Sequence, residues 1–214
     1  MAQNCIPLVL SLILGQPATT PASDLSHFRA ENGAQQFAVH GKPFLILGGE
    51  LGNSSAGTAA QADSTLPDMA RMHLNTVLTP VAWEQMEPAE GHFDFTVLDH
   101  WIDVARHENL HLVLLWFGSW KNAFSEYAPG WVKADIKRFP RAQSANGTPL
   151  EILSTFGTET LRFDSRAFAA LMRHLSEKDR EQQTVLMVQV ENEVGAMDPR
   201  EIRTYRLRLY SVSP

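Results

Sequence analysis

Short, almost continuously apolar runs alternate with amphipathic segments along most of this chain, and that alternation restricts its fold more than any other feature. Apolar runs of strand length that lack a polar face predict strands buried on both sides, as in a parallel sheet covered by helices. We expect a hairpin around Gly41 that runs into a strand ending at Leu47. The further expected strands are 75–79, 110–117 and 184–190, and the expected helices are 63–74, 95–107 and 166–178.

Polar and aromatic residues gather directly behind each expected strand, which is typical of a barrel whose active site lies at the C-terminal ends of its strands. A dinucleotide-binding fold is disfavoured because Gly48-Gly49-Glu50-Leu51-Gly52 lacks the G-x-G-x-x-G spacing. A barrel needs eight strands and about 250 residues, whereas four strands are recognisable here. We therefore expect an α/β fold of the (β/α)8 TIM-barrel type that is incomplete, with about the first four βα units.

Composition excludes several classes of protein. With 44% hydrophobic and 20% charged residues the chain can form a core. Its net charge of -6 offers no basic surface for nucleic acid, and no run approaches the roughly 18 apolar residues of a membrane span. The single cysteine, Cys5, rules out an internal disulfide framework. No metal or organic cofactor is implied by any of these features.

The N-terminus differs from the rest of the chain. Ile6–Leu14 is an apolar run of secretory length, and a small, Pro-rich stretch with a candidate cleavage site at Thr20-Pro21-Ala22 follows it. Residues 1–5 carry no Lys or Arg, so a mis-assigned start or a buried N-terminal strand is the alternative. We expect residues 1–22 to be a signal peptide and the protein to be periplasmic or secreted.

The strongest motif follows the fourth expected strand. Three polar residues, Glu191, Asn192 and Glu193, come directly after the apolar run Val185–Val190. Burying two carboxylates is costly, which indicates a solvated cleft. Two acids this close also repel, which raises the pKa of one of them, as a general acid in glycoside hydrolysis requires. The alternative is a helix N-terminus that Glu191 and Asn192 merely cap.

The segment Gln189-Val190-Glu191-Asn192-Glu193-Val194-Gly195 resembles the signature of glycoside hydrolase family 35, the β-galactosidases. That resemblance, which covers residues 36–197, implies that Glu193 is the general acid/base and that Asn192 binds the sugar 2-hydroxyl. Two further segments are similar to the family. Trp83–Phe95 matches its W-x-x-x-E-P-x-x-G-x-(Y/F)-x-F pattern, and Leu115–Asn122 falls where the family carries strand-three sugar-binding residues.

The chain departs from this family at two sugar-binding positions. Pro80 stands where many members have Tyr, and Ser119 stands where they have Glu before the strand-three Trp. The pattern is closer to a bacterial branch, in which other polar residues would supply the missing contacts. The resulting substrate-binding set is Asn192, Glu191, Trp120, Lys121, Asn122, Glu50, Asn53 and Trp83. Trp120 and Trp131 are candidate stacking platforms, whereas Trp101 is expected in the core and Trp83 could equally pack under the loop.

A second motif points to another class of enzyme. His107-Glu108-Asn109-Leu110-His111 matches the H-E-x-x-H pattern of zinc proteases, which requires both imidazoles on one face of a continuous helix. Here the amphipathic pattern stops near Glu108, Asn109 suits a helix C-terminus, and a strand begins at once. A metalloprotease is therefore the least favoured interpretation, and no metal ligand is assigned.

The retaining mechanism needs a nucleophile about 5–5.5 Å from the acid/base. The resemblance places that residue on strand seven, which this chain does not contain, so we expect the isolated chain to be inactive or nearly so. The predicted function is hydrolysis of terminal β-linked galactose or a related sugar, with a catalytically inactive carbohydrate-binding fragment as the alternative. Residues 23–197 would form half a barrel that needs its missing half or a second chain. Residues 198–214 form an atypical tail that a truncation or frameshift would explain.

Overall fold

The computed structural model describes residues 25–144, 146–194 and 202–203. The expected signal peptide, Cys5 and most of the C-terminal tail therefore lie outside the described residues. The chain divides into two compact units, one ending at Pro43 and the other beginning at Phe44.

The first unit is a three-stranded antiparallel sheet of β1 (His27–Glu31), β2 (Ala34–Val39) and β3 (Lys42–Pro43). Two-residue turns join the strands, at Asn32-Gly33 and at His40-Gly41. All four turn residues have φ between 48° and 79°, the left-handed region that two-residue hairpin turns of type I′ require and that Asn and Gly adopt readily. The expected hairpin around Gly41 is confirmed.

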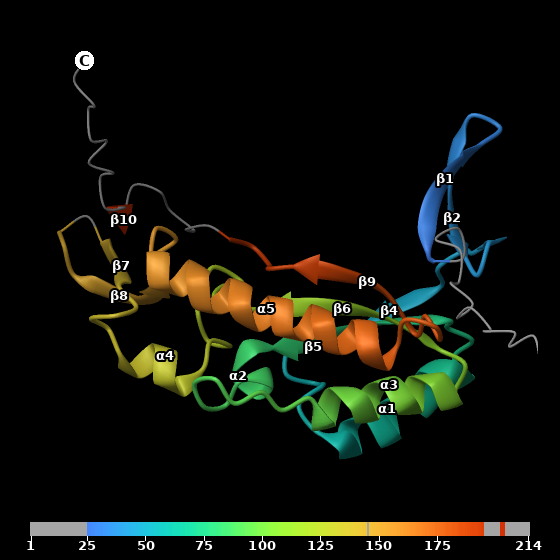
Figure 1. The fold of residues 1–214 in the computed structure, drawn as a ribbon, viewed down its shortest axis with the longest axis horizontal. Coiled ribbons are helices and arrows are strands. Elements are labelled where there is room, and N and C mark those ends of the chain that lie inside the picture. Colours follow the sequence, from blue (N-terminus) through green and yellow to red (C-terminus); the bar gives the residue numbers. More distant parts are fainter. Residues whose placement is uncertain (1–24, 145, 195–201, 204–214) are drawn as a thin grey trace, which may run out of the picture. The chain divides into compact units, whose positions relative to one another are not determined.

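The second unit contains a parallel sheet whose strands occur in chain order. It consists of β4 (Gly48–Glu50), β5 (Thr76–Ala82), β6 (His111–Phe117) and β9 (Val185–Val190), in the order β4-β5-β6-β9 (Figure 1). All three strand pairs are parallel. A doubly wound sheet reverses its strand order at a switch point, whereas a barrel adds each strand beside the last. The arrangement is that of the first βα units of a barrel.

The connections between these strands hold five helices. They are α1 (Ala59–Arg71), α2 (Trp83–Met86), α3 (Thr96–His107), α4 (Gly130–Ala134) and α5 (Thr158–Lys178). Helix α1 begins with a capping box, in which Thr58 accepts from the Gln61 amide and Gln61 accepts from the Thr58 amide. Figure 1 shows α1 and α3 side by side against the sheet. No helix among the described residues is long and apolar enough to cross a membrane.

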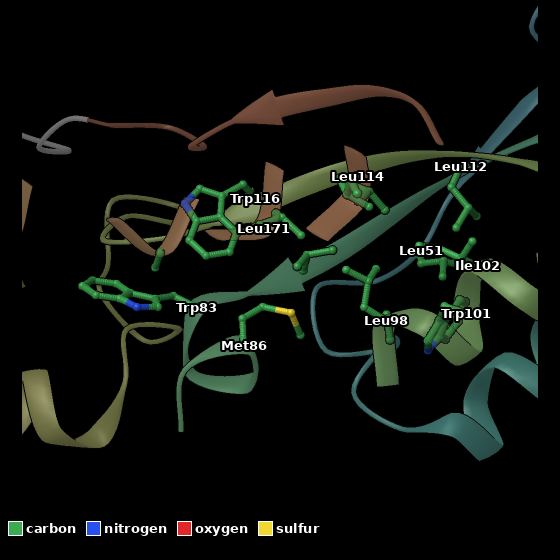
Figure 2. Close-up of a cluster of buried hydrophobic side chains, with 14 of the residues drawn as sticks. Leu51, Trp83, Met86, Leu98, Trp101, Ile102, Leu112, Leu114, Trp116 and Leu171 are labelled. Carbon is green, nitrogen blue, oxygen red and sulfur yellow. The ribbon is translucent and has the colours of Figure 1, made fainter. Parts of the chain in front are cut away.

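The core lies between the sheet and these helices. Leu112, Leu114 and Trp116 alternate along β6 toward the helices, as period-two geometry requires (Figure 2). Leu66 of α1, Ile102 of α3 and Leu171 of α5 pack in the same apolar cluster, so one core holds all three long helices to one sheet. Trp101 is buried in this cluster, as predicted.

Several elements differ from the sequence expectation. The first barrel strand is Gly48–Glu50, not the stretch that ends at Leu47, and Leu45 and Leu47 are 77% and 52% exposed. The stretch between the expected strand 110–117 and the expected helix 166–178 contains a hairpin of β7 (Arg141–Ser144) and β8 (Pro149–Leu153), and β10 (Ile202–Arg203) pairs with β7. Helix α5 begins at Thr158, before the expected start at Arg166. The first turns were not predicted because the buried residues Thr160 and Asp164 are polar and interrupt the apolar pattern.

Candidate active site

The ends of β6 and β9 meet at the C-terminal edge of the parallel sheet, where a barrel carries its active site. Lys121 follows β6, and its ammonium donates a hydrogen bond of 2.8 Å to Oδ1 of Asn192, which follows β9. The Lys121 side chain is buried and lies over the Phe117 ring, 4.5 Å from the ring centroid. The structure thus brings together two of the predicted sugar-binding residues and fixes the amide of Asn192 through one charge-assisted contact.

The backbone behind β9 is turned sharply at the two glutamates. Glu191 has φ 60° and Glu193 has φ 50°, in the left-handed region that costs an L-residue about 1–2 kcal/mol. Glu193 is exposed, whereas Glu191 is half-buried. Such backbone conformations persist where surrounding contacts hold them and are concentrated at functional sites.

Glu191 is predicted to bind substrate, but its carboxylate is directed into the protein. Its two oxygens accept hydrogen bonds of 3.1 Å from the backbone N–H groups of Ser119 and Trp120. Asp164 of α5 lies beside it and accepts from the Trp116 indole at 3.0 Å, the Ser119 amide at 2.7 Å and the Ser119 hydroxyl at 2.5 Å. The loop after β6 is therefore held by carboxyl groups from two other elements.

The sequence predicts that one acid of the Glu-Asn-Glu motif has a raised pKa. That acid is Glu191, whose pKa rises to about 9, mainly because burial disfavours its charged form and further because Asp164 lies beside it. The partner carboxyl comes from α5 and not from the motif itself. The residue with the raised pKa is thus the one that holds the loop, and a contact of Glu191 with substrate stays a prediction.

The Trp83 side chain is fully buried in the apolar cluster (Figure 2). Its indole donates to the Glu87 carboxylate at 2.9 Å, and the Gly91 amide donates to the same carboxylate at 2.7 Å. Arg166 of α5 pairs with Glu87 as well. The W-x-x-x-E-P-x-x-G pattern therefore builds the turn behind β5, and Trp83 is a core residue there and not a sugar contact.

The two candidate stacking platforms are also packed into the protein. Trp120 is 5% exposed and packs against Ala142 and Ile152 of the β7-β8 hairpin. Trp131 donates from its indole to the Glu87 carbonyl and meets the Trp83 ring edge-on at 5.9 Å. Trp131 is half-buried, and Trp120 borders a cavity of about 150 Å³. The cavity is lined by Ser119, Trp120, Ser154, Thr155, Gly157, Thr160, Leu161, Asp164, Glu191 and Val194.

The remaining predicted contacts lie farther along the same edge. Glu50 is the last residue of β4 and is exposed, and Asn53 is half-buried in the turn that follows. Asn122 is exposed, with φ 52°, next to Lys121. The hydrogen bonds of the described residues bring none of these three to Asn192. Their role as substrate contacts stays a prediction.

Two residues of this region were missed in the sequence. Asp164 could have been found as a carboxyl on the inward face of a helical stretch, where it requires partners. Tyr127 carries no such signal. Its hydroxyl is 2.9 Å from the Ser54 hydroxyl behind β4, and its ring meets Phe117 at 5.2 Å, so it links the ends of two strands.

The H-E-x-x-H match is divided between two elements. Helix α3 ends at His107, Asn109 has φ 57°, and β6 begins at His111. The ring of His107 contacts Glu108, whereas that of His111 contacts the Gln183 carbonyl. Because the helix stops between them, the two imidazoles do not share a helical face. Within the described part of the chain, no group of three or more His, Cys, Asp or Glu is arranged to hold a metal ion.

A parallel βα sheet with an Asn-Glu pair behind its last strand is the arrangement expected of a glycoside hydrolase of the TIM-barrel class, and comparisons with known proteins agree. The chain belongs to glycoside hydrolase family 42, described as β-galactosidase, whose profile matches residues 54–207. A β-galactosidase of Xanthomonas manihotis is 36% identical over 90 residues, which are 42% of this chain and 15% of that protein. The exo-β-1,4-mannosidase Op5Man5 from Opitutaceae bacterium strain TAV5 has a similar fold, with TM-score 0.51 and 20% identity over 82% of this chain and 28% of that one.

These matches confirm the glycoside hydrolase class and the barrel fold that the sequence predicts. The matching family is 42, whereas the motif pointed to family 35, and the match extends beyond Met197, where the resemblance to family 35 ends. The chain spans less than a third of the length of either relative.

Proposed function

We propose that this chain carries the acid/base half of a retaining glycoside hydrolase that acts on terminal β-galactosides or a related β-linked sugar. The observation that supports it best is the Lys121–Asn192 hydrogen bond, next to an exposed Glu193 at the end of β9. The family and the Xanthomonas manihotis relative are both described as β-galactosidase, which supports galactose as the sugar.

Asn192 and Glu193 would share the work at the scissile bond. Since Oδ1 of Asn192 accepts from Lys121, its Nδ2 group remains as the donor for the sugar 2-hydroxyl. Glu193 would first protonate the departing glycosidic oxygen and later, as a carboxylate, take a proton from the attacking water. A general acid of this kind contributes about 10²–10⁴-fold to the rate.

The retaining mechanism also needs a carboxylate nucleophile. Two acids near the strand ends are engaged elsewhere, since Glu84 pairs with Lys133 and Asp94 accepts from the Thr96 amide at the start of α3. We place the nucleophile outside these four strands and propose that the isolated chain is inactive or nearly so. Val190 of β9 is 62% exposed, as expected of a strand that another barrel half or a second chain would cover.

The test combines binding with hydrolysis on the purified 214-residue chain. Titration with methyl β-galactoside, followed by NMR, should show binding that Asn192→Ala abolishes. An aryl β-galactoside should remain uncleaved. Cleavage by the wild type that Glu193→Gln abolishes would support Glu193 as the acid/base. It would also overturn the proposal that the nucleophile lies outside these four strands. If no β-galactoside and no β-mannoside binds, the proposed function is overturned.

A sugar-binding protein without catalysis is the second candidate, favoured because Glu84 and Asp94 are engaged elsewhere and leave the site without a second carboxylate from these two residues. The enzyme half and the sugar-binding protein differ in whether Glu193 supports hydrolysis once a second barrel half is supplied. Co-expression with the C-terminal barrel half of the Xanthomonas manihotis relative should give hydrolysis that depends on Glu193 if the chain is an enzyme half. Binding without hydrolysis in a soluble complex would favour the alternative.

We also propose export, with removal of residues 1–22. N-terminal sequencing of the protein recovered from periplasm or medium should begin near Ser23. Recovery of the protein with Met1 intact, in the cytoplasm only, would contradict it.

A further inference from the structure

We propose that Glu191 and Asp164 share one proton and act together as a positioning pair, which fixes the turn that carries Asn192 and Glu193. The inference rests on the proposed function, because that function assigns the sugar contact to Asn192 and the acid/base role to Glu193 on this turn. It concerns residues that touch other protein groups and not the sugar.

The hydrogen bonds show what the pair holds. The carboxyl oxygens accept from the Trp116 indole, from the amides of Ser119 and Trp120, and from the Ser119 hydroxyl. These donors lie at the end of β6 and in the loop behind it, whereas the acceptors come from α5 and from the residue after β9. Three elements therefore converge on one pair of carboxyl groups.

Gly118 marks how closely these elements approach. A Cβ at this position would meet the carboxyl oxygens of both Glu191 and Asp164, and the Trp116 indole nitrogen, well inside contact distance. Any side chain would require all three groups to move. The glycine is therefore required by the close approach and not by its backbone angle.

The two adjacent carboxyl groups, those of Glu191 and Asp164, have no cation beside them among the described residues, so one of them is expected to carry a proton. All donors to the pair are neutral, and among the described residues no cationic side chain forms an ion pair with either carboxyl. The nearest ammonium along the loop, that of Lys121, is bonded to Asn192. Two carboxylates side by side without a cation repel strongly, and one proton held between them removes that repulsion. Burial raises the pKa of Glu191 to about 9, so the proton stays at neutral pH.

The pair acts on the site through the backbone. Glu191 directly precedes Asn192, and its left-handed φ of 60° is maintained while its carboxyl is bound to the β6 loop. The same loop carries Lys121, the partner of Asn192. Loss of the shared proton would leave two adjacent carboxylates that repel each other, which would shift Glu191 away from Asp164 and with it the turn that carries Asn192. The site is thus predicted to fail at alkaline pH without any change in its own polar groups.

The sign of the pH effect follows from the raised pKa. The folded state holds the proton that the unfolded chain releases near the ordinary pKa of 4.5, so stability is highest below that value and falls as the pH rises toward 9. Glu191→Gln replaces the protonated acid by a neutral group of the same shape, which can donate to Asp164. It should keep one of the two backbone amide contacts and lose the other, because an amide nitrogen cannot accept a hydrogen bond, and it should remove this pH dependence.

The experiment measures melting temperatures of the 214-residue chain between pH 6 and 10, for wild type, Glu191→Gln and Glu177→Gln. Glu177 is exposed on α5 and serves as the matched control. Between pH 7 and 9.5 the wild type and the control should lose about 5 °C more than Glu191→Gln does. Equal pH dependence in all three proteins would overturn the proposal.

Two NMR measurements separate positioning from a merely structural role. In wild type, one carboxyl carbon should titrate with a midpoint above pH 7, and this requires no variant to fold. The side-chain amide signals of Asn192 should move with the same midpoint, and should not move over that range in Glu191→Gln. The proposal would be refuted if no carboxyl titrated above pH 7. It would also be refuted if the Asn192 side-chain amide signals did not move with that titration. Neither readout needs sugar or hydrolysis, so failure here is distinct from failure of the proposed function.

Discussion

Gly118→Ala is the substitution that tests the geometry of this site most directly. The added Cβ would meet three groups at once: the carboxyls of Glu191 and Asp164 and the indole nitrogen of Trp116. All three belong to the hydrogen-bond network that holds the loop after β6. Because Trp116 lies in the core and Asp164 is on a long helix, Glu191 is the group most able to move. We expect it to be displaced from the amides of Ser119 and Trp120.

The size of the effect follows from two costs. Inserting a methyl group into a packed place costs about 1–3 kcal/mol. Displacing Glu191 also leaves the amide of Trp120 without its acceptor, since the Ser119 amide still has Asp164, and one unsatisfied buried amide costs about 1–3 kcal/mol. The free energy of unfolding should therefore fall by about 2–6 kcal/mol. That is a large part of the stability of a domain of ordinary size.

Urea denaturation followed by tryptophan fluorescence measures this change, with Gly130→Ala as the control. Gly130 lies in the first turn of α4, and a Cβ there would meet nothing within 4 Å. Its replacement should leave the free energy of unfolding unchanged or raise it by about 0.4–1 kcal/mol. If Gly118→Ala is as stable as Gly130→Ala, the close approach at Gly118 does not exist and the positioning pair is not built as described.

Two further substitutions separate the sugar site from the core. Lys121→Met removes the donor to Asn192 while keeping an apolar stem over Phe117, so β-galactoside affinity in NMR titrations should fall about tenfold, a loss of about 1.4 kcal/mol, with a smaller change in urea midpoint. Unchanged affinity would remove Lys121 from the site. Glu87→Ala leaves the buried Trp83 indole and the Arg166 guanidinium without their acceptor, and should lower the free energy of unfolding in urea by about 3–5 kcal/mol. A loss below about 1 kcal/mol would show that this carboxylate does not organise the turn behind β5.

The long apolar strands could be predicted because their side chains alone identify them. Leu110–Phe117 is apolar almost throughout, and the structure has β6 at His111–Phe117. The first barrel strand gave no such signal, since Gly48 and Gly49 have no side chain to bury. Pairing with β5 holds this strand, and a Cβ on Gly49 would press on Leu74 at 2.9 Å. The glycines are explained by close packing, which is visible only once the neighbouring residues are placed.

The site was predicted in position more than in detail. A polar run behind a buried strand is enough to place Asn192 and Glu193 at the C-terminal edge of the sheet. Whether a carboxyl leaves that edge toward the sugar or toward the surrounding helices depends on what lies on each side. For Glu191 the deciding partner is Asp164, on a helix that precedes β9 in the chain. Trp83 was ambiguous for the same reason, since a tryptophan in a motif is equally suited to a core and to a sugar.

Under the proposed function, the two glutamates of the motif meet two different requirements, proton exchange and positioning. A glutamate that must exchange a proton with a glycosidic oxygen has to be accessible, and Glu193 is exposed. A residue that must hold the backbone in a left-handed turn has to be fixed, and Glu191 is bound to two amides and next to Asp164. One residue could not meet both demands, because the contacts that fix a carboxyl also occupy its oxygens. The comparison of Glu191→Gln with Glu193→Gln in a completed barrel should then separate them: the first keeps activity at neutral pH, and the second loses about 10²–10⁴-fold. Equal losses would mean that Glu191 takes part in the chemistry itself.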